Sequence, residues 1–174
     1  MVDVKEQLSH DLVRTSWGWV GISYSSRGLR RLILPRSGRA AVARELGLPR
    51  VVALAPWEAF RRWLLAFLLG TGGCPDVPVD LTGIEGFTGR VLETARTIPP
   101  GTTITYGELA RRAGSPRASR AAGQVMARNP IPLVIPCHRV VAAAGPGGFA
   151  GGLAMKTRLQ ALAARACSGG ARRS

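Results

Sequence analysis

The sequence predicts an α+β protein, with a small N-terminal sheet-and-helix unit followed by a mostly helical half. Residues 16–34 have the composition of a β-hairpin, whereas three short stretches after residue 85 have helical spacing. Residues 71–78 (TGGCPDVP) are rich in Gly and Pro and lack periodicity, which indicates a linker. We therefore expect an N-terminal α/β supporting domain with its linker, a C-terminal domain and a basic tail, at residues 1–78, 79–167 and 168–174.

The N-terminal half predicts one hairpin and two helices. Strand-favouring residues fill 16–24 and 28–34, with the turn SSRG between them and Pro35 after them. Residues 39–46 form a short helix that ends near Gly47. A longer helix over 57–69 has Pro56 near its start and Gly70 after it. Its apolar face consists of Trp57, Phe60, Leu64 and Leu68.

The C-terminal half predicts a helix-turn-helix. A first helix over 86–96 is followed by Pro99, Pro100 and Gly101, and then by a short extended piece. A helix over 106–113 stops at Gly114, and Ser115-Pro116 favours the start of a helix from about residue 117 to 128. Two short helices joined by a tight turn that contains Gly fit a helix-turn-helix.

The chain is strongly basic, and this favours polyanionic partners. Lys and Arg number 24 against 10 Asp and Glu, which gives a net charge of +14. No acidic side chain follows Glu108, although eleven Arg and Lys do. Nucleic acid is the first partner that such a charge predicts, and an acidic membrane surface is the second. The alternative is an arginine-rich proteome that places Arg on every solvated surface.

Several classes of protein are not expected. No apolar run reaches the roughly 18–20 residues that cross a membrane, and the first residues show no secretory signal. Three cysteines favour a reducing compartment over a disulfide framework. With no CxxC pair, and with His10 the only histidine besides His138, we predict neither a metal site nor a cofactor.

The second helix of the helix-turn-helix combines arginines with small residues. Arg117, Arg120 and Arg128 are separated by a run that is mostly Ala, Ser and Gly. Small side chains permit close approach to another surface, and Arg reaches phosphate. The alternative is a helix packed on its own domain, with its arginines pointing outward.

Residues 129–141 (NPIPLVIPCHRVV) carry the candidate chemistry. Three prolines prevent a regular helix and disfavour a central strand, so we expect a stiff, irregular wall. Cys137 is nucleophilic as a thiolate, which a neighbouring imidazole such as His138 promotes. Adjacent side chains do not face each other in regular structure, so a bridging water is the simpler link. The alternative is a buried structural cysteine.

The segment PCHRV, with NPIPLVI before it and GFAGGLAMK after it, resembles the O6-alkylguanine-DNA alkyltransferase family (methylated-DNA–protein-cysteine methyltransferases). Residues 101–110 (GTTITYGELA) and 115–128 resemble its helix-turn-helix, so the resemblance covers about residues 84–160. It implies a ribonuclease-H-like N-terminal domain and a winged helix-turn-helix domain. The implied function is DNA repair by irreversible, single-turnover transfer of an alkyl group from guanine O6 to Cys137, after the base has been flipped out.

The resemblance also implies a role for each matched residue. His138 is the general base, acting through water, and Tyr106 assists flipping and donates toward guanine N3. Arg120 enters the base stack, and Asn129 bridges the recognition helix to the active-site segment. The remaining DNA-binding positions are Arg117, Ser119, Ala121, Gly123 and Arg128. The pocket walls are Pro132, Val140, Phe149, Ala150 and Gly151.

The implied partner is double-stranded DNA containing O6-alkylguanine, bound through the minor groove with little sequence specificity. No membrane contact is expected. We expect a monomer located in the cytoplasm, associated with the nucleoid in a prokaryote.

Two departures from the family pattern bear on this interpretation. Phe149 and Ala150 replace a usual Tyr and a frequent Ser in the loop, while Ala163 replaces the Glu that orients the histidine. Gln160, a backbone carbonyl, an upstream acid such as Glu93, or the terminal carboxylate could substitute for that Glu. The loss raises a second hypothesis, a lesion-binding protein with impaired transfer. A winged-helix transcription factor and a Cys-His hydrolase are the weaker alternatives.

Overall fold

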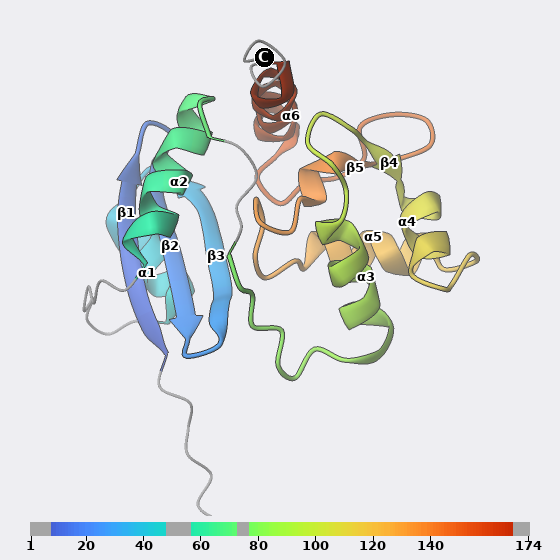
Figure 1. Cartoon of the computed structure of the whole chain (residues 1–174), viewed down its shortest axis with the longest axis horizontal. Helices are drawn as coiled ribbons and strands as arrows, with labels where there is room; N and C mark the ends of the chain where they lie inside the picture. Colours follow the sequence, from blue (N-terminus) through green and yellow to red (C-terminus); the bar gives the residue numbers. More distant parts are fainter. Residues whose placement is uncertain (1–7, 48–56, 73–76, 169–174) are drawn as a thin grey trace, which may run out of the picture.

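The computed structural model describes residues 8–47, 57–72 and 77–168. Its N-terminal half contains an antiparallel sheet in the order β1 (Ser9–Thr15), β2 (Gly18–Ser25) and β3 (Gly28–Arg36) (Figure 1). The tight connection between β2 and β3 is the predicted hairpin, in which Ser25 pairs with Gly28. The third strand, β1, was not expected from the sequence. It pairs along its whole length with β2, from Ser9 opposite Tyr24 to Thr15 opposite Gly18.

Two helices cover opposite faces of this sheet. Helix α1 (Arg39–Leu46) packs Val42 and Leu46 against one face, where Gly21 of β2 leaves no room for a side chain. Helix α2 (Glu58–Leu69) adds Phe60 and Leu64 to the main core on the other face. Because Gly47 and Gly70 both adopt left-handed backbone conformations, they end the two helices where the sequence predicts.

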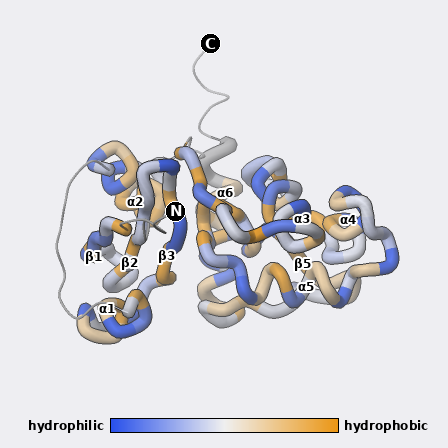
Figure 2. Tube along the Cα trace, turned by 90° about the horizontal axis from the view of Figure 1, so that it is seen from below, coloured by the Kyte–Doolittle hydropathy of each residue, from blue (hydrophilic) through white to orange (hydrophobic). Residues whose placement is uncertain are grey.

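The C-terminal half is helical apart from one two-stranded parallel pair, β4 with β5. Its elements follow one another along the chain as α3 (Gly86–Arg96), β4 (Ile104–Thr105), α4 (Tyr106–Arg112), α5 (Ser119–Ala127), a 3-10 turn η1 (Cys137–Arg139), β5 (Val140–Val141) and α6 (Leu153–Ser168). Helices α4 and α5 pack on each other and on α3, so the two predicted short helices are present and lie together. The two halves lie side by side, and one hydrophobic core runs through both (Figures 1 and 2).

The start of α5 corrects the prediction for the second helix. The helix begins at Ser119 rather than near Arg117, and no side chain caps its first turn. Ser115 accepts a hydrogen bond from Ala118 N through its main-chain carbonyl, so residues 115–118 form a separate turn. Arg117 therefore lies in this turn and not on the helix. Pro56, Cys74 and the tail from residue 169 lie outside the described residues.

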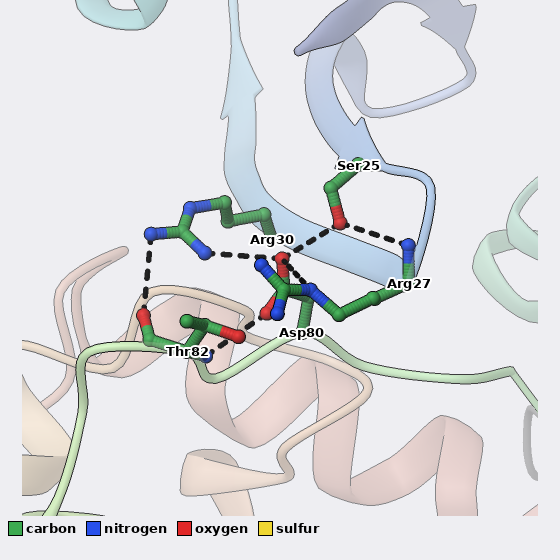
Figure 3. Close-up of polar contacts among 5 residues, drawn as sticks. All are labelled: Ser25, Arg27, Arg30, Asp80 and Thr82. Atoms are coloured by element: carbon green, nitrogen blue, oxygen red, sulfur yellow. Dashed lines mark hydrogen bonds and ion pairs between the residues drawn. The ribbon is translucent and has the colours of Figure 1, made fainter. Parts of the chain in front are cut away.

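A buried carboxylate joins the chain after the linker to the sheet (Figure 3). Asp80 is 3% exposed and accepts hydrogen bonds from Ser25 Oγ at 2.6 Å and from Arg30 Nη1 at 3.0 Å. Its other oxygen accepts from Thr82 N at 2.9 Å. Burial alone would raise the pKa of this carboxyl, but these hydrogen bonds hold its pKa well below the usual range. Asp80 is thus charged, and it fixes how the C-terminal half leaves the sheet.

No helix in the described ranges is both long and apolar enough to cross a membrane.

Candidate active site and nucleic-acid interface

The proline-rich segment forms a buried, irregular wall after α5, as the sequence predicts. Residues 131–140 are all buried. Leu133 has a φ of 74°, a left-handed conformation that is unusual for a residue with a branched side chain. Asn129 fastens the segment, because its Nδ2 donates to Ile135 O at 2.8 Å and its Oδ1 accepts from Ile131 N at 3.0 Å. The residue expected to bridge α5 and the active-site segment therefore lies between the two.

Cys137 and His138 lie side by side on the η1 turn at the end of this wall. Cys137 is 6% exposed and His138 is fully buried. Neither ring nitrogen of His138 has a hydrogen-bond partner within the described part of the chain. Burial, with the positive charges of Arg139 and Lys156, lowers the pKa of His138 to about 3. The imidazole is therefore neutral at physiological pH.

The Cys137 thiol experiences opposing influences. Burial raises its pKa, because a thiolate loses solvation away from water. A hydrogen bond from the Asn129 side chain and the charge of Lys156 act in the opposite direction. Because burial is the largest of these influences, the thiol is protonated at neutral pH, and the groups that favour the thiolate lie next to it.

Lys156, which the sequence analysis noted only as part of a motif, holds the loop beside the active site. It is fully buried, and its Nζ donates to the carbonyls of Val140 at 2.6 Å, Pro146 at 2.5 Å and Gly148 at 3.2 Å. Burial lowers the pKa of Lys156, and the neighbouring Cys137 raises it. A lysine surrounded by apolar residues and glycines in the sequence could have suggested this role, but its three acceptors could not be identified from spacing.

Gln160 makes no hydrogen bond to the imidazole ring of His138, but it does bind the main chain of that residue. Its Nε2 donates to His138 O at 2.8 Å. Among the expected substitutes for the missing Glu, Glu93 is exposed and its carboxylate accepts from Arg96. Ala163 is 2% exposed and therefore lies in the packed interior. The terminal carboxylate falls outside the described residues.

Tyr106 lies between α5 and the loop that contains Gly147 and Gly148. It opens α4, and its hydroxyl donates to Gly148 O at 3.3 Å. A Cβ on Gly147 would come within 2.8 Å of its ring, whereas one on Gly123 of α5 would meet the ring at an ordinary 3.8 Å. Burial and the nearby Cys137 raise the pKa of the Tyr106 hydroxyl, so this group is a proton donor at neutral pH.

Helix α5 turns its apolar residues inward, and the arginines on it and directly after it are exposed. Ala122 and Met126 are buried in the core, and Arg120 and Arg128 are exposed. Ser119, Ala121 and Gly123 are half-buried, so the surface of the helix between its arginines is shallow. The side chains of Arg117, Arg120 and Arg128 make no hydrogen bond or ion pair with any residue in the described ranges. Three cations thus remain available to an external anion.

Of the five predicted pocket-wall residues, two line a common cleft and three lie elsewhere. Pro132 and Ala150 line a cleft of about 290 Å³ between β3 and the active-site segment. Val140 is buried in β5, Phe149 packs half-buried against the main core, and Gly151 lies so close to Phe149 and Met155 that a Cβ would clash. No cluster of three or more His, Cys, Asp or Glu that could hold a metal occurs among the described residues.

The C-terminal half matches a family model and known proteins. Residues 86–164 match the model described as 6-O-methylguanine DNA methyltransferase, DNA binding domain. A methylated-DNA–protein-cysteine methyltransferase of Mycolicibacterium paratuberculosis is 47% identical over 91 residues, which cover 52% of this chain and 54% of that protein. The chain covers 61% and 64% of two archaeal proteins of the same name, so it matches between half and two thirds of these first relatives.

Longer matches extend the similarity to the N-terminal half. The human methylated-DNA–protein-cysteine methyltransferase is 35% identical over 154 residues, which cover 83% of this chain and 74% of that protein. The crystal structure of the Mycobacterium tuberculosis O6-methylguanine methyltransferase superimposes with a TM-score of 0.74 at 31% identity, covering 91% and 93% of the two chains. The structure of the same organism's protein in complex with DNA gives a TM-score of 0.76 at 30% identity, covering 91% and 94%. The mixed α and β architecture is therefore the one found in these proteins, and the chain belongs to the family of methylated-DNA–protein-cysteine methyltransferases.

Proposed function

We propose that this protein repairs duplex DNA by taking an alkyl group from guanine O6 onto Cys137, once per molecule. The observation that carries the proposal is the η1 turn, where a buried thiol adjoins a buried imidazole whose ring nitrogens have no hydrogen-bond partner among the described residues. The same half of the chain presents exposed Arg120 on α5 and Arg128 directly after it. We also propose the finer fold assignments, a ribonuclease-H-like N-terminal unit and a winged helix-turn-helix unit. A monomer that acts in the cytoplasm without a cofactor is part of the same proposal.

The transfer is a single displacement at the alkyl carbon. The sulfur of Cys137 forms a bond to that carbon, and the bond between the carbon and O6 breaks with its electron pair moving into the guanine ring. The thiol releases one proton and the departing guanine takes up one proton, so the products are a thioether and normal guanine. A thioether has no ready hydrolytic exit, and the protein is therefore consumed.

Proton movement depends on His138 and on the charges around it. The ring nitrogens lack protein partners, which suits a water shared with the thiol, and His138 then accepts the thiol proton through that water. Lys156 supplies positive charge that favours the thiolate. Tyr106 lies on the DNA-facing side and donates toward N3 of the departing base, for which its raised pKa is suitable.

DNA binding uses the shallow, arginine-flanked surface of α5. The half-buried Ala121 and Gly123 allow the helix to lie deep in the minor groove. Arg120 then replaces the flipped base in the stack, which offsets part of the few kcal/mol lost in unstacking. Tyr106 must exchange its bond to Gly148 O for contacts to the DNA, because its hydroxyl donates to that carbonyl in the free protein.

The second candidate function is lesion binding with impaired transfer, and Ala163 is the observation that favours it. Because the chain carries Ala163 where the family has its orienting Glu, no carboxylate from that position stabilises an imidazolium at His138. We propose that Gln160 substitutes in part, by fixing the main chain of His138 rather than its ring.

In the deciding experiment, the protein is incubated with a duplex that contains one O6-methylguanine. The protein is then digested, and the mass of the peptide that contains Cys137 is measured by mass spectrometry. Addition of one methyl group to that peptide, in step with the appearance of repaired DNA, supports transfer. Tight binding to the lesion with an unmodified peptide supports the second function. Cys137→Ala is the control, and it should bind the lesion without repairing it. Ala163→Glu should accelerate transfer if the missing carboxylate is a defect, and should leave the rate unchanged if Gln160 already suffices.

A further inference from the structure

A cleft with arginines on both walls lies between the N-terminal sheet and the end of α5. Its volume is about 290 Å³, and Arg31, Arg36 and Glu45 form one wall. Arg128, Pro130 and Ala150 form the other. The two walls are joined at the floor, where Leu32 N donates to Pro130 O at 2.8 Å. Strand β3, at the edge of the sheet, therefore lies directly beside the residues that follow α5.

The charge in this cleft is only partly neutralised by the protein itself. Arg36 forms a double hydrogen bond with Glu45, at 3.2 Å and 3.1 Å, so these two charges cancel. Arg31 and Arg128 are exposed, and within the described ranges neither side chain has a hydrogen-bond or ion-pair partner. One uncompensated cation thus stands on each wall.

The cleft adjoins the C-terminal end of α5, because Ala127, the last residue of the helix, and Arg128 both line it. In Figure 2, α1 and α5 lie along the same edge of the molecule. Arg36 and Glu45 belong to β3 and α1, and Arg128 follows α5. Because Arg31 and Arg128 line the same cleft, a polyanion bound at Arg128 at the end of α5 lies close to Arg31.

We propose that the sheet domain takes part in DNA binding, with Arg31 contacting a backbone phosphate on the same duplex that α5 and Arg128 hold. This inference rests on the proposed function, and it adds a second, sequence-independent contact surface to it. Phosphate contacts of this kind position a protein on the duplex without reading bases. The N-terminal half then contributes directly to affinity, besides supporting the fold.

The test is the salt dependence of binding to an undamaged duplex. Each phosphate contact contributes about 0.9 to the slope of log affinity against log salt concentration. We expect Arg31→Ala to lower the slope by about 1 and to weaken binding about five- to tenfold near 100 mM salt. Arg62→Ala is the matched control, because Arg62 is an exposed cation on α2, which covers the opposite face of the sheet from α1.

A series of duplex lengths gives an independent measurement. When the duplex is shortened on the side of the cleft, the difference between wild type and Arg31→Ala should disappear, since the phosphate in question is then absent. Arg31→Lys should keep the slope, because it retains the charge.

The proposal is overturned if Arg31→Ala and Arg62→Ala bind alike while Arg120→Ala binds weakly, which would restrict the interface to α5. Wild-type protein that does not bind any duplex would instead refute the proposed function itself.

Discussion

The burial of His138 makes the stability of the folded protein depend on pH in a defined window. The imidazole is fully buried and both of its nitrogens lack partners in the described structure. Its pKa of about 3 in the folded state compares with 6.5 in an exposed histidine. Below pH 6.5 the unfolded chain therefore binds a proton that the folded chain does not, so stability falls as the pH falls.

The size of this effect follows from the difference in pKa. Each unit of pH between 6.5 and the folded pKa costs about 1.4 kcal/mol, so His138 removes about 3 kcal/mol between pH 6.5 and about 4.5. Asp80 contributes with the opposite shift. Since its pKa is lowered, its stabilisation is fully present above the ordinary aspartate pKa of 3.8 and is lost only below that pH. Glu108, with a pKa of about 2, likewise acts below 4.5.

The assay is urea unfolding at several pH values between about 7.5 and 4.5, comparing wild type with His138→Gln. We expect wild type to lose about 3 kcal/mol more than the variant over this range. His10→Gln is the comparison variant. Burial also lowers the pKa of His10, but its ring is only half-buried and shares a hydrogen bond with Ser23 Oγ at 2.7 Å, so we expect this variant to change the pH dependence less than His138→Gln does. Equal losses in wild type and His138→Gln would refute the reasoning, since they would show that the folded protein protonates the buried ring.

Three further changes test other contacts of the structure. Asp80→Asn should lower the free energy of unfolding, measured in urea, by about 3 kcal/mol, because Asp80 is a buried charge with partners. Glu93→Gln, which removes an exposed ion pair, is the control, and an equal or smaller loss in Asp80→Asn would contradict this prediction. Lys156→Met should raise the pKa of the acceptor thiol, because the charge of Lys156 favours the thiolate, and should slow methyl transfer about tenfold at neutral pH. A wild-type single-turnover rate would argue against any electrostatic role. Gly147→Ala should lower the melting temperature and cost about 1–3 kcal/mol, because φ is +68° and a Cβ would meet a tyrosine ring at 2.8 Å, whereas Gly148→Ala, with open space around it, should be neutral.

Local signals in the sequence were sufficient for most helices but not for every strand. Helices over 39–46 and 86–96 have the predicted bounds, because glycine and proline punctuate both. Strand β1 was missed because SHDLVRT has only Leu12 and Val13 as apolar residues, so its alternation is weak. Its extended conformation is fixed by pairing with β2, which is a tertiary contact.

The candidate site shows the same division between motif and long-range contact. Cys137, His138 and Asn129 could be chosen from the proline-rich segment, and the structure brings them together. The contacts of Lys156 and Gln160 could not be chosen, because they join α6 to main-chain carbonyls about 8 to 22 residues away, which have no side-chain signature. The candidate reactive groups can thus be chosen from the sequence, whereas the contacts that hold them depend on the tertiary structure.

The positive charge of the chain has opposite effects on the two reactive groups, and this decides how the site can work without a carboxylate. Lys156 favours a negative Cys137, whereas Arg139 and Lys156 together disfavour a positive His138. In a thiolate–imidazolium pair, the positive charges therefore stabilise the thiolate and destabilise the imidazolium. In the proposed transfer, the proton taken from the thiol does not remain long on His138, because the low pKa of the ring favours its loss to water or to the departing guanine. We therefore propose that His138 acts as a relay, while the charge that favours the thiolate resides on Lys156.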